Sequence, residues 1–241
     1  TALVASGAGV TVAKHGNRCV SSKCGSADIL EALGVKINMD TGKIKKCLQE
    51  IGIAFLFAPN LHLAMRYVMP ARKQIARKTI FNILGPLINP ARAANQLIGV
   101  YAKAWVRPLA EVLLNLGSKH ILVVHGADGL DEVTTTDRTF VTEVKGEVLI
   151  DYEIVPEDFG FKRANLDDLS GGSIDENVKI AQDILAGSPG SRRDIVLFNA
   201  GCAIYAADKA DTIAKGIRLA RVSLDSGAAL EKLKLLREYS R

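Results

Sequence analysis

The feature that most constrains the fold is an uninterrupted apolar run, Ile121–Val124, which ends at His125 and opens onto glycine and acidic residues. A strand of this composition has no face suited to water, so both faces must be covered, as in a parallel sheet between two layers of helices. Further apolar runs alternate with segments of helical composition along the chain. This alternation predicts an α/β fold with a mainly parallel central sheet and helices on both faces.

The individual elements follow from apolar patterning and from start and stop signals. We expect strands at Val10–Ala13, Gln96–Tyr101 and Ile195–Asn199, an apolar run at Ala54–Pro59, and an antiparallel ribbon over Thr134–Ile154. We expect helices at Ala27–Leu33, Asp40–Ile51, Pro108–Leu116, Ser173–Ala186, Ala200–Ala207, Asp211–Val222 and Ser226–Glu238. Two prolines predict a rigid loop at Gly85–Pro90.

Charge and hydropathy exclude several classes of function. Basic residues exceed acidic residues by 31 to 26, a formal net charge of +5, and only 5% of residues are aromatic. This mixed charge predicts no nucleic-acid partner, although the positive excess suits a small polyanion such as a phosphate ester. The apolar runs are far shorter than the ~20 residues of a membrane helix. No signal-peptide pattern follows Thr1, so we expect a cytoplasmic protein with no membrane partner.

The cysteines give no sign of a disulfide framework or a zinc site. They form no Cys-X-X-Cys pair and have no histidine at zinc-finger spacing; their positions are Cys19, Cys24, Cys47 and Cys202. Such sparse cysteines are typical of reduced, mostly buried thiols in a cytoplasmic protein.

A polar loop between an expected strand and an expected helix is the first candidate site. It concentrates hydrogen-bond donors, namely Lys14, Asn17, Arg18, Ser21, Ser22 and Ser26. Gly16 and Gly25 permit close approach of the backbone, and the following helix begins with free amides, so phosphate or diphosphate is the expected ligand. The alternative is a polar loop without a ligand.

Two adjacent carboxylates, Asp131 and Glu132, form the second candidate site. They follow the buried run Ile121–Val124, and ligands of open parallel sheets bind beyond the carboxyl ends of the strands. Carboxylate oxygens suit Mg²⁺, which is commonly shared with substrate phosphates. The alternative is a helix N-terminus that favours acidic residues. Asp128 is interpreted as a turn residue.

A basic stretch, residues 66–78, follows His62 and is expected to be helical. An arginine in this stretch could form bidentate hydrogen bonds with a carboxylate or a phosphate. The alternative is a solvated helix face. His15 has the intrinsic pKa of an acid or base, but the neighbouring Lys14 disfavours its charged form. His120 and His125 are interpreted as structural.

Taken together, these segments resemble the signature motifs of the anthranilate phosphoribosyltransferase family. The likeness runs in order through nearly the whole chain, over Val12–Arg18, Ser21–Asp28, Phe55–Pro59, Phe81–Pro90, His125–Thr134 and Asn199–Gly201. It implies transfer of a phosphoribosyl group from 5-phosphoribosyl 1-diphosphate (PRPP) to the amine of anthranilate, with release of diphosphate, in tryptophan biosynthesis. It also implies dependence on Mg²⁺ and a homodimer.

The resemblance also implies roles for individual residues. PRPP would be cradled by the loop residues Lys14, His15, Gly16, Asn17, Arg18, Cys19, Val20, Ser21, Ser22 and Ser26. Asn17 and His15 would contact anthranilate, Arg72 would hold its carboxylate, and Asp131 with Glu132 would bind Mg²⁺. No acid or base catalyst is assigned, because an aromatic amine loses its proton readily once it is bonded to carbon.

The chain departs from the family at its amino end. The family has a Gly-Thr-Gly-Gly-Asp diphosphate loop upstream of the matched residues, and this sequence lacks it. The resemblance therefore implies an N-terminally truncated chain without most of the helical domain. Residues 1–241 would form the α/β domain, with roughly 40–82 contributing in part to the small helical domain.

Two alternative functions stay open at this point. A pyrimidine nucleoside phosphorylase shares this architecture and a related lysine-containing loop, although Ser21–Ser26 has the transferase form. A non-catalytic module that binds a phospho-ligand or a nucleic acid would need a more one-sided surface charge, and its polynucleotide binding would depend steeply on salt.

Overall fold

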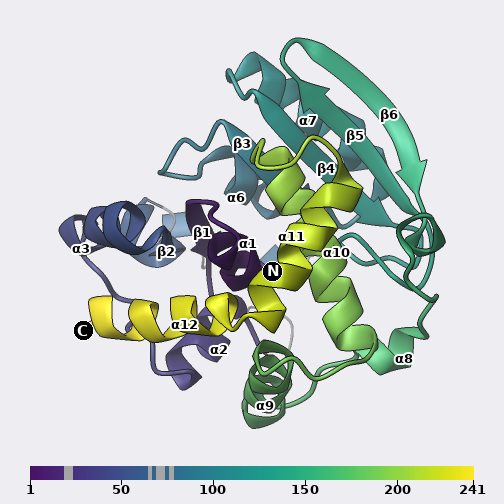
Figure 1. Cartoon of the computed structure of the whole chain (residues 1–241). Coiled ribbons are helices and arrows are strands. Elements are labelled where there is room, and N and C mark those ends of the chain that lie inside the picture. Colours follow the sequence, from purple (N-terminus) through teal and green to yellow (C-terminus); the bar gives the residue numbers. More distant parts are fainter. Residues whose placement is uncertain (19–23, 65–66, 69–73, 76–78) are drawn as a thin grey trace.

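The computed structural model describes residues 1–18, 24–64, 67–68, 74–75 and 79–241. Its strands form two sheets with helices packed around them (Figure 1). The smaller sheet pairs β1 (Val12–Gly16) in parallel with β2 (Ile53–Phe57), and every β2 residue is buried. Together with the helices on both sides, this parallel arrangement confirms the predicted α/β class.

The larger sheet has the order β3-β4-β5-β6 and mixes the two kinds of pairing. Its strands are β3 (Asn95–Gly99), β4 (His120–Gly126), β5 (Thr139–Lys145) and β6 (Val148–Ile154). β3 and β4 are parallel, whereas β5 and β6 continue the sheet as antiparallel strands. The predicted antiparallel ribbon is confirmed, and the expected central sheet is divided into these two sheets.

Helices cover both faces of β4, as its apolar composition requires. On one face, Ile121 and Val123 share a core cluster with residues of α7 (Val106–Asn115). On the other face, Leu122 and Val124 belong to the large core cluster that includes the apolar side chains of α10 (Ser191–Ala206). Alternate side chains of β4 therefore pack into two different hydrophobic cores, one on each face of the sheet.

The two ends of the described chain pack against each other. α1 (Ala2–Gly7) contacts α11 (Ile213–Asp225) and α12 (Ala228–Tyr239), as Figure 1 shows. The Ser223 hydroxyl donates a hydrogen bond to the Val4 carbonyl oxygen at 2.7 Å. A Cβ on Gly7 would lie 2.8 Å from the Ala229 nitrogen, so only glycine permits this close approach.

Local capping signals account for several other helices. Asp40 accepts a hydrogen bond from the Lys43 amide at the start of α3 (Thr41–Lys46), and a π-helical turn, η1 (Cys47–Ile51), completes that segment. Ser173 and Glu176 form the predicted capping box of α9 (Ile174–Leu185). The remaining helical segments are α2 (Ser26–Ala32), α4 (Ala58–Leu61), η2 (Ile80–Asn82), α6 (Leu84–Leu87), η3 (Lys103–Trp105), η4 (Pro156–Phe159) and α8 (Leu166–Leu169).

The prediction of a strand at Ile195–Asn199 is wrong, because these residues lie inside helix α10. Leu197 and Phe198 are fully buried, and Ala200 and Cys202 continue the buried surface. A helix segment enclosed by protein needs no polar face, so its short apolar run has the same appearance as a buried strand.

Two boundaries also differ from the predictions. β1 continues to Gly16, so Lys14 and His15 are strand residues and not loop residues. Within the expected rigid loop Gly85–Pro90, the first residues belong to the one-turn helix α6. Pro86 is tolerated there because the first turn of a helix needs no amide donor. None of the described helices is long and apolar enough to cross a membrane.

Candidate active site

The candidate site begins at the carboxyl end of β1, where Gly16 permits close packing. A Cβ at Gly16 would lie 2.7 Å from the Ser26 hydroxyl oxygen and 2.8 Å from a ring carbon of Phe55. The first residue of α2 is therefore brought directly against the last residue of β1. This contact confirms that the strand and the helix meet where the sequence predicts a phosphate loop.

Hydrogen bonds fix the described ends of this loop. The Ala27 amide donates to the Asn17 carbonyl oxygen at 3.3 Å, and the Gly25 amide donates to the Asp28 carboxylate at 2.9 Å. Arg18 forms ion pairs with Asp28 at 3.1 Å and with Glu31 at 2.7 Å. Arg18 thus ties the loop to α2, and its contact with a phosphate stays a prediction.

His15 lies in a pair with His62, a residue to which the sequence pattern assigned no role. The two Nε2 atoms are 3.2 Å apart, and His15 Nδ1 is 3.3 Å from the Gly85 carbonyl oxygen. Burial, and then the charges of His62 and Lys14, lower the pKa of His15. A neutral His15 that donates from Nδ1 to Gly85 accepts from His62 at Nε2, so neither ring nitrogen is free to act as a base.

The structure brings the acidic pair to the Lys14 side of this site. Asp131 and Glu132 lie in the loop after β4, and their charges both act on the Lys14 ammonium. Two candidate sites that are far apart in the sequence therefore form one cluster of opposite charges. The pair is not at a helix N-terminus.

Desolvation shifts the pKa values of this cluster toward the neutral forms. Lys14 and Glu132 are both exposed, and partial desolvation by the protein around them is the main cause of both shifts. Burial lowers the pKa of Lys14, and the two carboxylates partly oppose this change. Burial and the charge of Asp131 raise the pKa of Glu132.

Close backbone packing holds the acidic loop in place. A Cβ on Gly99, the last residue of β3, would overlap the carbonyl oxygen of Asp131. Asp128 accepts hydrogen bonds from the Leu130 amide at 3.0 Å and from the Thr134 hydroxyl at 2.5 Å. The interpretation of Asp128 as a turn residue is therefore confirmed. Gly99 carries no motif that would mark it in the sequence.

The donor set of the acidic pair suits a weakly coordinated hard cation. Among the described residues, no group of three or more His, Cys, Asp or Glu side chains could hold a metal ion. Two carboxylates open to solvent match Mg²⁺, which keeps several waters and shares substrate phosphates. After desolvation, repulsion by Asp131 is the second cause that raises the pKa of Glu132, and a divalent cation would relieve this repulsion.

Several predicted site residues lie outside the described part of the chain. They are Cys19, Val20, Ser21, Ser22 and Arg72. Most of the basic stretch at residues 66–78 also lies outside it. The roles of these residues stay predictions.

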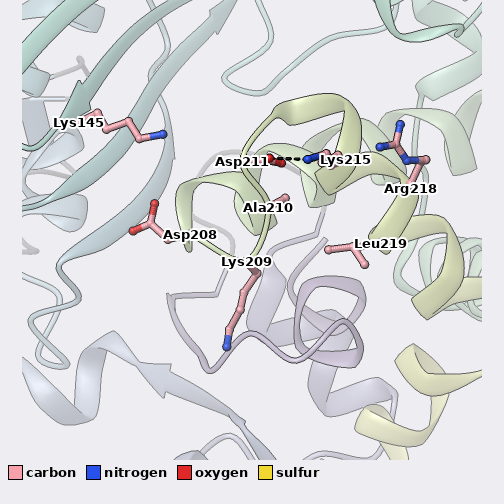
Figure 2. Close-up of a pocket in the computed structure, with 8 residues that line it drawn as sticks. All are labelled: Lys145, Asp208, Lys209, Ala210, Asp211, Lys215, Arg218 and Leu219. Atoms are coloured by element: carbon pink, nitrogen blue, oxygen red, sulfur yellow. Dashed lines mark hydrogen bonds and ion pairs between the residues drawn. The ribbon is translucent and has the colours of Figure 1, made fainter.

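A separate surface pocket of about 600 Å³ lies beside the turn between α10 and α11. It is lined by Lys145, Asp208, Lys209, Ala210, Asp211, Lys215, Arg218 and Leu219 (Figure 2). Its carboxylates are engaged with protein partners: Asp208 with His120 and Asn95, and Asp211 with Lys215. None of the predicted site residues lines this pocket.

His120 is structural, as predicted, and joins two carboxylates. It is 1% exposed, and its ring nitrogens lie 3.0 Å from Glu143 and 2.6 Å from Asp208. Burial by itself would lower the pKa of His120, but these hydrogen bonds outweigh it and raise the pKa. Burial opposes the change at Glu143 as well, where bonds from His120, Tyr205 and Tyr152 lower the pKa.

The His120 network should make stability depend on pH. The raised pKa of His120 contributes stability below its usual value of 6.5, and this contribution is lost as pH rises through the raised pKa. The lowered pKa of Glu143 contributes above 4.5 and is lost as pH falls through the lowered pKa. We expect His120→Phe to lower the free energy of unfolding by about 3 kcal/mol between pH 4.5 and pH 6.5. The loss should be smaller below and above this range. Urea unfolding at a series of pH values measures the difference; a constant difference would contradict the network.

The comparisons with known proteins agree with the geometry. Residues 1–230 match the model of a glycosyl transferase family, a/b domain. Anthranilate phosphoribosyltransferase from Persephonella marina is 53% identical over 242 residues, which cover 100% of this chain and 71% of the relative. The enzyme of that name from Symbiobacterium thermophilum is 48% identical over 239 residues, covering 99% and 70%.

Solved structures show the same relationship in three dimensions. Anthranilate phosphoribosyltransferase from Thermus thermophilus matches with a TM-score of 0.94 at 44% identity, over 100% of this chain and 71% of that one. The Saccharomyces cerevisiae enzyme in complex with PRPP and Mg matches with a TM-score of 0.88 at 28% identity, over 99% and 68%. Because both the sequence and the fold match along the whole length of this chain, the chain belongs to the anthranilate phosphoribosyltransferase family.

Proposed function

We propose that this chain transfers the phosphoribosyl group of PRPP to the amine of anthranilate, forming N-(5-phosphoribosyl)anthranilate and diphosphate. The observation that carries the proposal is that Lys14, on β1, lies near enough to Asp131 and Glu132, in the loop after β4, for their charges to act on its ammonium group. A cation and two carboxylates at one place suit a substrate that carries a diphosphate and a divalent metal. Family membership adds independent support.

We assign PRPP to the carboxyl end of β1. The ammonium of Lys14 would neutralise part of the diphosphate charge, and the close packing at Gly16 places the Ser26 hydroxyl at the same end of the strand. Residues 19–23 of the loop, which lie outside the described part of the chain, would supply further donors. Positioned donors of this kind stabilise charge that develops on a leaving group.

Asp131 and Glu132 would hold Mg²⁺. When bound, the metal would supply positive charge to the departing diphosphate. The protein's own part is to hold the two carboxylates adjacent to each other and near Lys14. In the Saccharomyces cerevisiae relative, PRPP and Mg occur together in one complex, which supports this assignment.

Anthranilate would approach from the side of His15 and Asn17. The aromatic amine needs no strong base, because it loses its proton readily after it has bonded to C1 of the ribosyl group. The engaged ring nitrogens of His15 agree with an orienting role. Positioning of the two substrates would then supply most of the rate. The contact of Arg72 with the anthranilate carboxylate, a homodimer and a cytoplasmic location also belong to this proposal.

The test is a turnover assay with Mg²⁺, PRPP and anthranilate, in which the change in anthranilate fluorescence reports the reaction. Because the chain spans about 70% of the length of its relatives, the assay should compare the 241-residue chain with the same chain extended by the preceding segment of a relative. We expect turnover at least in the extended form. Absence of turnover in both forms, or phosphorolysis of thymidine, would overturn the proposal.

A further inference from the structure

Asn199, on helix α10, makes a buried clamp on the backbone of the acidic loop. The residue is 4% exposed. Its Oδ1 accepts from the Val133 amide at 3.0 Å, while its Nδ2 donates to the Val133 carbonyl oxygen at 2.7 Å and to the Ile195 carbonyl oxygen at 2.9 Å. One side chain thus satisfies both polar groups of Val133, and both of its amide protons are used.

The clamp acts one peptide bond away from the acidic pair. The Val133 amide belongs to the peptide group that joins Val133 to Glu132, so the bond to Asn199 fixes the orientation of that group. On the other side, the backbone of Asp131 packs against Gly99. The two acidic residues are therefore held between a glycine contact and an amide clamp, although their side chains remain open to solvent.

The helix that carries the clamp is itself firmly placed. A Cβ on Gly201 would lie 2.7 Å from the nitrogen of Ile217, in α11, and a Cβ on Gly216 would lie 3.0 Å from the carbonyl carbon of Gly201. The backbones of α10 and α11 thus touch at this crossing. Leu197 and Phe198 are fully buried in the same helix. Because α10 is fixed in the core, the hydrogen bonds of Asn199 hold Val133, and with it the acidic loop, in a fixed position.

We infer that Asn199 is a positioning residue that sets the geometry in which Glu132 and Asp131 bind the divalent cation of the substrate complex. This inference rests on the proposed function, because it takes the acidic pair as the metal ligands. A supporting shell of this kind commonly changes metal affinity by 10–100-fold when it is removed. A merely structural asparagine would affect stability and leave metal affinity unchanged.

The experiment measures binding of Mn²⁺, in the presence of inorganic diphosphate, to the 241-residue chain by electron paramagnetic resonance. We expect Asn199→Ala to weaken Mn²⁺ binding by about 10-fold. Asn199→Asp, of nearly the same shape, should weaken it similarly, because its second carboxylate oxygen faces the Val133 and Ile195 carbonyl oxygens. In the turnover assay, both variants should need more Mg²⁺ and recover most of kcat at saturation.

The matched control is Ser223→Ala, which removes another buried hydrogen bond from a side chain to a backbone carbonyl, in a helix that carries no site residue. It should lower the thermal unfolding midpoint without changing Mn²⁺ affinity. Wild-type affinity in both Asn199 variants, or an equal loss in Ser223→Ala, would overturn the inference. If the wild type binds no better than Asp131→Asn/Glu132→Gln, the metal assignment fails instead, which separates the two failures.

Discussion

The double variant Asp131→Asn/Glu132→Gln should lower kcat/KM for PRPP by about 10³-fold at a fixed Mg²⁺ concentration. The amides keep the shape of the side chains but remove both negative charges that would attract the cation. Steady-state kinetics over a range of Mg²⁺ concentrations measure the effect.

A second acidic pair provides the matched control for this variant. Glu157 and Asp158 are adjacent and exposed in η4, and they are not among the predicted site residues. Glu157→Gln/Asp158→Asn makes the same change in net charge, so it separates a local loss of metal ligands from a general change in electrostatics. An unchanged Mg²⁺ titration in the Asp131/Glu132 variant would remove the metal assignment.

Gly99→Ala should damage the site from the neighbouring strand. Its added methyl group would overlap the Asp131 carbonyl oxygen and lie 3.3 Å from the Glu132 nitrogen. These are backbone atoms, so a side-chain rotation cannot relieve the overlap and the acidic loop must move. We expect a loss of about 1–3 kcal/mol in the free energy of unfolding and about 10-fold weaker Mn²⁺ binding.

The comparison for Gly99→Ala is Gly42→Ala in α3, where the new Cβ would meet only the side chain of Asp40 at 3.1 Å. That oxygen belongs to a side chain that can shift slightly, so metal binding should not change. Urea unfolding and Mn²⁺ titration of both variants provide the measurement. Wild-type stability and metal affinity in Gly99→Ala would show that β3 does not hold the acidic loop.

Local signals in the sequence predicted much of the fold. The caps at Asp40 and Ser173 locate two helices because a side chain that binds backbone amides acts within a few residues. The position of the acidic pair follows for a similar reason, since a buried strand must end in a loop at the edge of a sheet. Contacts within one segment can be inferred from that segment alone.

Long-range contacts could not be predicted in the same way. Nothing in the residues around Lys14 indicates that Asp131 and Glu132 are its electrostatic neighbours. The pairing of His15 with His62 depends on where a distant segment returns to the sheet. The helical state of residues 195–199 depends on the protein that encloses α10, because composition is the same for a buried helix and a buried strand.

The division of the strands between two sheets has a thermodynamic consequence for the proposed substrate. Lys14 belongs to the two-stranded sheet, whereas Asp131 and Glu132 follow a strand of the four-stranded sheet. A diphosphate and its cation that contact both would act as a bridge between two separately hydrogen-bonded units. Part of the binding free energy would then oppose separation of the two sheets. Binding of the ligand would therefore raise the free energy of unfolding of the protein.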